Sequence, residues 1–323
     1  MDDIKLFDSL APTREAMTKA IGRVVVGQEE VVDLMLTALF SDGHCLFVGV
    51  PGLAKTLLVR TVAQTLGVSF GRIQFTPDLM PSDITGTDVL EENRETGARD
   101  LRFVKGPVFC NLLLADEINR TPPKTQAALL QAMQEREVTA LGKTHDLEAP
   151  FLVFATQNPI EQEGTYPLPE AQQDRFMFSI KVGYPSIEEE REIVRRTTVG
   201  ALPDAEHVLD LERLLALQGV LRRLPANGDV IDYSVALSAA TRAGSAYESA
   251  RWIQWGAGPR ASQYLAIGAR TRAALRGRDV PTREDVRAVA LAVLRHRIVL
   301  NFEAEAAGLT PDSVITDLMN EVG

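Results

Sequence analysis

The chain has 323 residues, of which 45% are apolar and 24% charged, values typical of a soluble globular protein with a substantial core. Its formal net charge of −10 argues against a nucleic-acid surface, which usually needs a clustered basic face. The two cysteines, Cys45 and Cys110, lie in apolar runs and predict buried thiols in a reducing compartment, not a disulfide framework. Without a signal-peptide core or an apolar run of membrane-spanning length, the sequence predicts a cytoplasmic protein.

The first half of the chain alternates short apolar runs with helical patterns, as βα units do. The expected strands are 44–49, 71–76, 108–117, 151–159 and 176–185. The expected helices are 56–67 and 123–137, and the second begins with a proline. The third strand is an unbroken apolar run, typical of a strand buried on both faces. This half therefore predicts an α/β domain with a parallel sheet flanked by helices.

After Pro185 the helical period dominates to the end of the chain. We expect helices at 187–198, 209–224, 231–250, 261–275 and 283–295. Turns rich in Gly, Pro and Asn separate them. The sequence thus predicts an α/β domain at 1–185 and an all-helical domain at 186–323.

A candidate phosphate-binding loop, GVPGLAKT at 49–56, lies between the first expected strand and a helix. This context suits the G-x-x-x-x-G-K-[ST] motif, although Ala54 replaces the second glycine. Its methyl group is tolerable if Ala54 has helical dihedral angles. The amides would bind phosphate oxygens at the helix N-terminus, Lys55 would contact the β- and γ-phosphates, and Thr56 would bind Mg²⁺.

The nucleotide-binding residues expected in this part of the chain are Gly49, Pro51, Gly52, Leu53, Ala54, Lys55, Thr56 and Leu57. The alternative is a generic loop without a ligand.

Two carboxylates, Asp116 and Glu117, end the third apolar strand, and packing does not explain them there. Asp116 is placed to hold Mg²⁺, directly or through water, and Glu117 to orient and deprotonate an attacking water. The alternative is a solvated acidic turn. The loop and the acidic pair together favour a nucleoside triphosphatase.

With these motifs the sequence resembles the AAA+ ATPases and, among them, the MoxR family of the helix-2-insert group. The resemblance covers nearly the whole chain. Besides the loop and the acidic strand it rests on VVVGQEEVV at 24–32, ATQNP at 155–159, PEAQQDRF at 169–176 and GAGPRA at 256–261. The last segment departs from the family's G-A-S-P-R-A form at Gly258. The resemblance implies a P-loop AAA+ core followed by a C-terminal helical lid domain.

The resemblance implies that Val26, Gly27 and Gln28 lie near the adenine. It also implies a sensor 1 role for Asn158, whose uncharged side chain can position the attacking water. The alternative for Asn158 is a common turn element before proline.

Two arginines gain roles from the same resemblance. Arg175 resembles an arginine finger that stabilises charge on the γ-phosphate of a neighbouring subunit, and Arg260 resembles the sensor 2 residue that reports the γ-phosphate to the lid. The alternatives are a surface ion pair for Arg175 and packing or solvation for Arg260. An interface role for Arg120 stays open.

Two segments between the core motifs, 86–107 and 137–150, are expected as hairpins with polar tips. In the helix-2-insert group such insertions face the central channel of a ring. We therefore regard them as candidates for contact with a protein partner, the alternative being two solvated loops.

The resemblance implies an ATPase that uses ATP and Mg²⁺, forms a hexameric ring, and remodels or matures client proteins or inserts their cofactors. The expected partner is a protein with a von Willebrand factor A domain. Two other functions stay open: a nucleotide-gated assembly scaffold and a DNA-acting AAA+ protein. The acidic balance of the chain disfavours the second.

Overall fold

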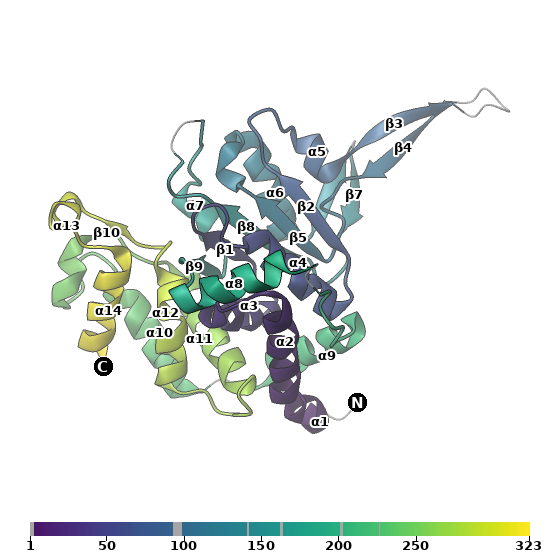
Figure 1. Cartoon of the computed structure of the whole chain (residues 1–323). Helices are drawn as coiled ribbons and strands as arrows, with labels where there is room; N and C mark the ends of the chain where they lie inside the picture. The colour runs from purple at the N-terminus through teal and green to yellow at the C-terminus, as the bar shows by residue number, and fades with distance from the viewer. Residues whose placement is uncertain (1–2, 93–98, 141, 162–163, 201–202, 226) are drawn as a thin grey trace.

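The computed structural model describes residues 3–92, 99–140, 142–161, 164–200, 203–225 and 227–323 (Figure 1). Its core is a five-stranded parallel sheet in the order β2-β5-β8-β1-β9. The strands are β1 (Cys45–Val48), β2 (Phe70–Gln74), β5 (Leu112–Asp116), β8 (Leu152–Gln157) and β9 (Phe178–Lys181). All the strands expected for the parallel sheet are present, each shorter than the apolar run that predicted it.

Hydrophobic cores lie on both faces of this sheet, as expected for buried parallel strands. Successive side chains of a strand point to opposite faces, so Leu112 and Leu114 of β5 enter one core while Leu113 and Ala115 enter the other. The helices of this part are α1 (Asp3–Asp8), α2 (Leu10–Val24), α3 (Glu29–Phe40), α4 (Lys55–Leu66), α5 (Pro81–Thr85), η1 (Ile118–Arg120), α6 (Pro123–Glu135) and α7 (Glu170–Gln173).

Among the described residues, the C-terminal part is helical apart from one short strand pair. Its helices are α8 (Ile187–Thr198), α9 (Leu211–Arg223), α10 (Gly228–Ala240), η2 (Glu248–Trp252), α11 (Pro259–Ala274), α12 (Arg283–Leu294), α13 (Phe302–Ala306) and α14 (Pro311–Val322). The helix expected at 231–250 ends at Ala240, because the chain turns at Gly244, which has φ +81°. The periodicity also did not predict the antiparallel pair of β10 (Ile253–Trp255) with β11 (Val299–Leu300).

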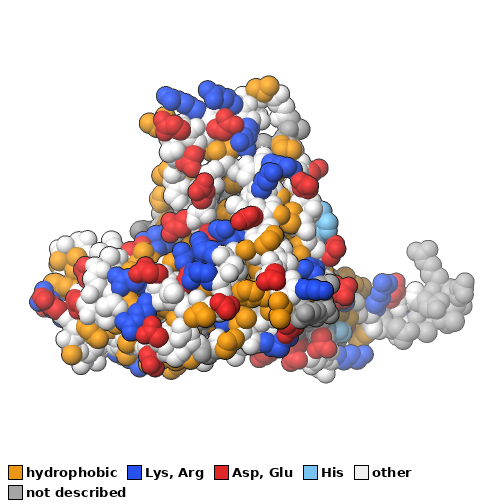
Figure 2. All heavy atoms as spheres, turned by 90° about the horizontal axis from the view of Figure 1, so that it is seen from below, with side chains coloured by type: hydrophobic (Ala, Val, Ile, Leu, Met, Phe, Trp, Pro, Cys, Tyr) orange, Lys and Arg blue, Asp and Glu red, His pale blue; other side chains and the backbone are white. Residues whose placement is uncertain are grey.

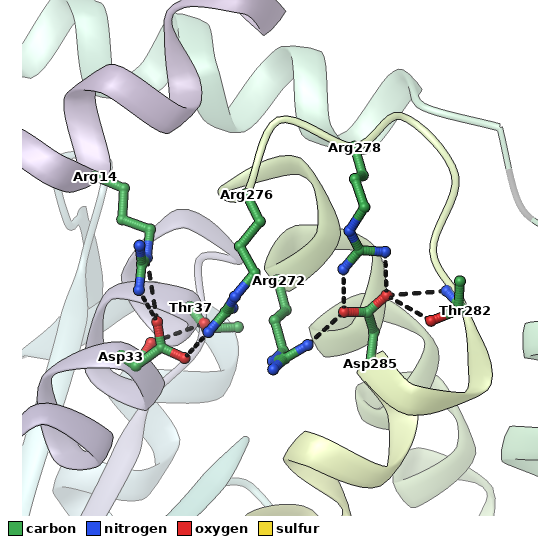
Figure 3. A network of polar contacts seen from close by, with 8 residues as sticks. All are labelled: Arg14, Asp33, Thr37, Arg272, Arg276, Arg278, Thr282 and Asp285. Carbon is green, nitrogen blue, oxygen red and sulfur yellow. Dashed lines mark hydrogen bonds and ion pairs between the residues drawn. The ribbon is translucent and has the colours of Figure 1, made fainter.

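A half-buried carboxylate joins the N-terminal helices to the C-terminal part (Figure 3). Asp33 of α3 accepts a hydrogen bond from Arg14 of α2 at 2.7 Å and another from Arg276, which follows α11, at 2.9 Å. Burial acts to raise the pKa of Asp33, but the two guanidinium groups hold it below its ordinary value. The pair of arginines thus makes the ionised carboxylate a bridge between α2, α3 and the end of α11.

A second carboxylate, Asp285, fixes α12 to the end of α11 (Figure 3). Its side chain is fully buried and accepts hydrogen bonds from Arg272 and Arg278, and from the backbone N–H of Thr282 at 3.0 Å. Burial opposes ionisation, but these donors lower the pKa of Asp285 to about 2. Asp285 therefore caps its own helix and ties that helix to its neighbour.

Two antiparallel hairpins occur where they were expected. β3 (Gly86–Glu92) pairs with β4 (Arg99–Lys105) and projects from the body of the molecule, whereas β6 (Glu137–Ala140) pairs with β7 (Lys143–Asp146) (Figure 1). Most of the expected tip of the first hairpin, residues 93–98, lies outside the described residues.

The two hairpins share an aromatic contact. Phe103 of β4 stacks on His145 of β7 with ring centroids 4.1 Å apart, and Phe109 meets both rings edge-on. Such ring pairs add to the stabilisation from burial alone. The hairpins are therefore packed against each other.

Both cysteines are free thiols, in agreement with the sequence. Cys45 is fully buried, whereas Cys110 is only partly buried, and burial raises the pKa of Cys110 to about 12. Among the helices of the described residues, none combines the length and the apolar character needed to span a bilayer.

His44 precedes β1 and is buried in a fixed tautomer. Its Nδ1 accepts the backbone N–H of Val153 at 3.0 Å, which leaves Nε2 to donate to the carbonyl oxygen of Met133 at 3.3 Å. Burial lowers the pKa of His44 from 6.5 to about 4. The folded chain therefore keeps this imidazole neutral at pH values where a solvated histidine is charged.

We predict that His44 contributes to acid sensitivity. As the pH falls from 6.5 to about 4, the histidine becomes protonated in the unfolded chain but stays neutral in the folded chain. The free energy of unfolding therefore decreases, by about 3 kcal/mol in total. The change His44→Gln, whose amide can serve both hydrogen bonds, should remove this part of the pH dependence in urea unfolding. His207→Gln, at a half-exposed site, should keep it. If the free energy of unfolding depends on pH equally in wild type and His44→Gln, His44 is not the source of the acid sensitivity.

Candidate nucleotide-binding site

The phosphate loop connects β1 to α4 and holds a charged side chain at its centre. Lys55 Nζ donates to the carbonyl oxygens of Gly49 and Val50, the second at 3.1 Å. Burial lowers the pKa of Lys55, while the nearby carboxylates of Asp116 and Glu117 act in the opposite direction. The ammonium group therefore lies inside the loop and faces the acidic pair across the site.

Ala54 does not have the helical dihedral angles that its tolerance in the motif was expected to require. Its φ of 56° and ψ of 20° lie in the left-handed region, directly before the first residue of α4. This conformation costs a residue with a Cβ about 1–2 kcal/mol of conformational energy, whereas it costs glycine little. The expectation was wrong because the loop must reverse its direction to enter the helix, so Ala54 is a strained position.

Asp116 lies at the carboxyl end of β5 and meets the loop, as the motifs predicted. Its Oδ2 accepts a hydrogen bond from Thr56 at 3.2 Å and one from Arg72 at 2.8 Å, and its Oδ1 accepts one from Thr156 at 2.6 Å. The carboxylate is buried, so these donors fix its orientation. The hydroxyl of Thr56 and the carboxylate of Asp116 thus converge on one point.

These two groups fit the metal that was expected. Hydroxyl and carboxylate oxygens are the donors that Mg²⁺ prefers, and Mg²⁺ is usually bound by one or two protein oxygens together with phosphates. Among the described residues no group of three His, Cys, Asp or Glu side chains could hold a metal by itself. The arrangement therefore suits a cation shared with a phosphate ligand.

Glu117 follows Asp116 in a left-handed conformation, with φ of 58°. Its N–H donates to the hydroxyl of Thr156 at 2.8 Å, and its carboxylate accepts from Gln74 at 2.8 Å and pairs with Arg120 at 3.1 Å. The carboxylate is thus turned away from the line of the strand and fixed by two side chains.

Sequence reasoning missed Arg72, Gln74 and Thr156. Arg72 and Gln74 are alternate residues at the carboxyl end of β2, and Gln74 is paired with Asp116 in the sheet register. The signal was present in the polar residues of the expected strand 71–76. It became interpretable only once β2 was known to lie beside β5.

Asn158 follows β8 and is buried beside the acidic strand, where it was expected. Its Oδ1 accepts the N–H of Ile160 at 3.2 Å, and its Nδ2 donates to Glu161 at 3.3 Å. Glu161 also pairs with Arg120, which in turn contacts Glu117. Arg120 therefore bridges the acidic pair and the Asn158 segment within one chain.

An apolar pocket adjoins the phosphate loop. It is lined by the end of α2, the loop, and one side of α8, with Val24, Val25, Val26, Gln28, Gly52, Leu53, Ala54, Leu57, Pro185, Ile193, Arg196 and Thr197. Its position and lining suit the flat apolar faces of a nucleobase. Predicted residues from the V-G-Q segment and from the loop therefore meet here.

The contribution of α8 was not predicted, because no motif marks it. Arg196 closes the pocket by donating to the carbonyl oxygens of Gly22 at 3.0 Å and Arg23 at 3.3 Å. Gly27 lies beside Glu189, and a Cβ at Gly27 would come within 2.0 Å of that carboxylate. The helix after Pro185 thus packs against the V-G-Q segment.

Arg175 and Arg260 do not lie at this site. Strands β1 and β9 are parallel, with Cys45 opposite Phe178; the phosphate loop follows β1, whereas Arg175 precedes β9. Arg260 pairs with Asp174 at 2.7 Å and lies at the same edge as Arg175. The two arginines are therefore separated by the length of the sheet from the phosphate loop of their own chain.

These arginines line a polar hollow at the amino end of the sheet, with Asp42, His44, Met133, Gln134, Arg136, Arg175, Arg260 and Tyr264. The Arg175 guanidinium makes no ion pair or hydrogen bond within the part of the chain that the structure describes. Arg260 is the first-turn residue of α11, and packing of α11 against α3 brings it to this edge. Contact with the γ-phosphate in the same chain is therefore not supported for Arg260.

Comparisons with known proteins agree with this geometry. The ATPase family associated with various cellular activities (AAA) matches residues 44–178, and the AAA lid domain matches residues 245–318. Chaperone MoxR1 of Mycobacterium tuberculosis is 48% identical over 313 residues, which cover 96% of this chain and 82% of that protein. The chain belongs to the MoxR family of AAA+ ATPases.

Other relatives extend over the same length. The YeaC protein of Bacillus subtilis is 40% identical over 98% of this chain and 96% of its own. A crystal structure of a candidate ATPase from Cytophaga hutchinsonii is 40% identical, with a TM-score of 0.90 over 99% of this chain and 97% of that one. The predicted MoxR resemblance and the predicted AAA+ core with a C-terminal lid are thus confirmed.

We predict that Ala54→Gly relieves strain in this MoxR-family loop. The free energy of unfolding in urea should rise by up to about 1 kcal/mol, since the left-handed strain of about 1–2 kcal/mol exceeds the added backbone entropy of glycine. Nucleotide affinity should be retained. Ala63→Gly, in the interior of α4, should instead destabilise the chain by about 1 kcal/mol. A loss in Ala54→Gly equal to that control would contradict the strain.

Proposed function

We propose that this MoxR-family chain hydrolyses ATP with Mg²⁺ as part of a ring, expected to be a hexamer, and uses the cycle to remodel or mature client proteins or to insert their cofactors. The observation that carries the proposal is the placement of two sets of groups. The phosphate loop and acidic pair occupy one edge of the sheet, and Arg175 and Arg260 occupy the other. In a ring, the loop and acidic pair of one chain would complete a catalytic site together with the two arginines of the next chain.

The nucleotide would lie along the loop. The apolar pocket would take the adenine, the backbone amides of residues 52–56 would bind the phosphates, and Lys55 would pair with the β- and γ-phosphates. Thr56 and Asp116 would hold Mg²⁺, which neutralises charge on the phosphate oxygens. Arg72 shares an oxygen of Asp116, but its side chain is about half exposed, so it can move aside at little cost.

Glu117 is the proposed base, which accepts a proton from the attacking water at its carboxylate. Gln74 and Arg120 hold that carboxylate, so they set the direction from which water can approach it. Asn158, adjacent on β8, orients the same water with an uncharged side chain. These groups leave the chemistry to positioning and electrostatics, as phosphoryl transfer requires.

Arg175 and Arg260 would act on the nucleotide of a neighbouring subunit. Both lie beside one hollow, and neither can reach the loop of its own chain without crossing the sheet. Positive charge there would stabilise the charge that builds on the γ-phosphate. An isolated protomer is then expected to be a poor ATPase.

The proposed client is a protein, and a partner with a von Willebrand factor A domain is the expectation from the family. One of the relatives is named a chaperone. The first hairpin supports a protein contact, because several of its apolar side chains are exposed, namely Val89, Leu90, Leu101 and Val104. Exposed apolar groups on a projecting element suit contact with another polypeptide.

Charge on one face of the molecule and the net charge do not favour nucleic acid as the client. On the face in Figure 2, Lys and Arg side chains form small groups with Asp and Glu side chains beside them, and no basic area extends across the face. Binding to a phosphate backbone depends on such an area. The net charge of −10 points in the same direction.

Glu117→Gln tests the base. The variant should bind ATP with near wild-type affinity, because the loop is intact, but hydrolyse it roughly 10²–10⁴-fold more slowly. Phosphate release and equilibrium binding of a fluorescent ATP analogue measure the two properties. Hydrolysis near the wild-type rate would remove Glu117 from the proposed role. Loss of binding in Lys55→Ala is the matched control for the loop.

Arg175→Ala tests action between subunits. We expect ATP binding to persist while hydrolysis falls roughly 10³-fold or more, since the arginine stabilises the transition state. Mixing Arg175→Ala with Lys55→Ala should restore part of the activity. At shared interfaces the first variant supplies the loop and the second supplies the arginine. Absence of recovery at every mixing ratio would refute the role across subunits.

A further inference from the structure

The segment that carries Arg175, residues 174–177 and hereafter the arginine segment, is held by side chains of the C-terminal helices. Arg297, just after α12, donates to the carbonyl oxygen of Asp174 at 2.9 Å, of Phe176 at 2.6 Å and of Met177 at 3.3 Å. Tyr264 of α11 reaches the remaining carbonyl oxygen, that of Arg175, at 3.5 Å. Every backbone carbonyl of the arginine segment thus meets a side chain from the lid.

The side chain of Asp174 adds a second attachment. One oxygen accepts from Arg297 at 2.8 Å and the other from Arg260 at 2.7 Å. A single carboxylate therefore sets the spacing between the arginine segment, the start of α11 and the end of α12. Arg175 itself, which lines the polar hollow, takes its position from this connection.

The Arg297 side chain is 1% exposed, which is costly for a charged group. Burial lowers the pKa of Arg297, and the carboxylate of Asp174 opposes that change. Only the planar guanidinium can serve one carboxylate and several carbonyl oxygens at once. The ring of Tyr264 packs over it, with 5.1 Å from the guanidinium carbon to the ring centroid.

We propose that Arg297 is a positioning residue for hydrolysis: through Asp174 and the carbonyl oxygens of the arginine segment, it couples the position of the lid to the position of Arg175 and Arg260. This inference rests on the proposed role of these two arginines at a neighbouring nucleotide. Arg297 is not among the residues proposed to contact the nucleotide, and its hydrogen bonds include those to the arginine segment. Movement of α11 and α12 would shift the arginine segment with them, since its carbonyl groups are bonded to those helices.

The test uses Arg297→Lys, which keeps the charge but loses the fork that bonds several carbonyl oxygens. In the full-length protein kcat for ATP should fall roughly tenfold to a hundredfold, as expected for a displaced catalytic group. KM and ATP affinity should stay near wild type, since the loop is remote. Arg295→Lys is the matched control: Arg295 is also largely buried near the end of α12, but it bonds Asp312 and the Ser179 carbonyl oxygen and should leave kcat near wild type.

A double-variant comparison separates positioning from loss of stability. If Arg297 acts through Arg175, the change Arg297→Lys should lower kcat by a clearly larger factor in the wild type than in Arg175→Ala, where only its effect on Arg260 is left. The same fold-loss in both backgrounds would overturn the inference. If the thermal transition shows that Arg297→Lys does not fold, Asp174→Asn replaces it in the same comparison. Asp174 accepts from Arg297 and is more exposed, and the loss of kcat in the two backgrounds is interpreted in the same way.

Mixing distinguishes this inference from the proposed function. Arg297→Lys combined with Lys55→Ala should regain activity, because the second protein supplies correctly placed arginines to the intact loop of the first. Recovery for Arg175→Ala but not for Arg297→Lys would overturn the positioning role alone. Failure of recovery for Arg175→Ala would overturn both.

Discussion

The direction of the parallel strands is the constraint on which the rest of this structure depends. Loops that leave β1, β5 and β8 all emerge at the carboxyl edge, so the phosphate loop, the acidic pair and Asn158 meet without any special folding of their segments. Residues that enter a strand lie at the opposite edge, and Arg175 is among them. One sheet thus carries two chemically different edges, and a nucleotide bound at the first cannot meet the second within the same chain.

The C-terminal helices are connected to both edges of the sheet. At one edge, α8 closes the apolar pocket, and Arg196 bonds the backbone carbonyl oxygens of the last turn of α2. At the other, α11 and α12 hold the residues that enter β9. Asp33 joins the end of α11 to α3, the helix that follows the V-G-Q segment (Figure 3). These connections join the elements that line the apolar pocket to the elements that hold the two arginines.

Much of the fold and of the candidate site could be predicted because the signals are contiguous in sequence. Apolar runs located the sheet strands, and the phosphate loop and acidic pair need only a strand and a turn. Ala54 could not be judged, since its dihedral angles depend on how the loop enters α4. The positions of Gln74 and Thr156 depend on the order of the strands, and the position of Arg260 depends on the packing of α11 on α3. No local sequence pattern predicts either of these. The predicted division of the chain at Pro185 remains a prediction.

The stack of Phe103 on His145 attaches the projecting hairpin of β3 and β4 to the hairpin of β6 and β7. Phe109 belongs to the same cluster and stands shortly before β5, the strand that ends in the acidic pair. A force on the hairpin of β3 and β4 would be shared with the hairpin of β6 and β7 and passed to the segment just before β5. Such a force would therefore act on the strand that ends in Asp116, directly before Glu117.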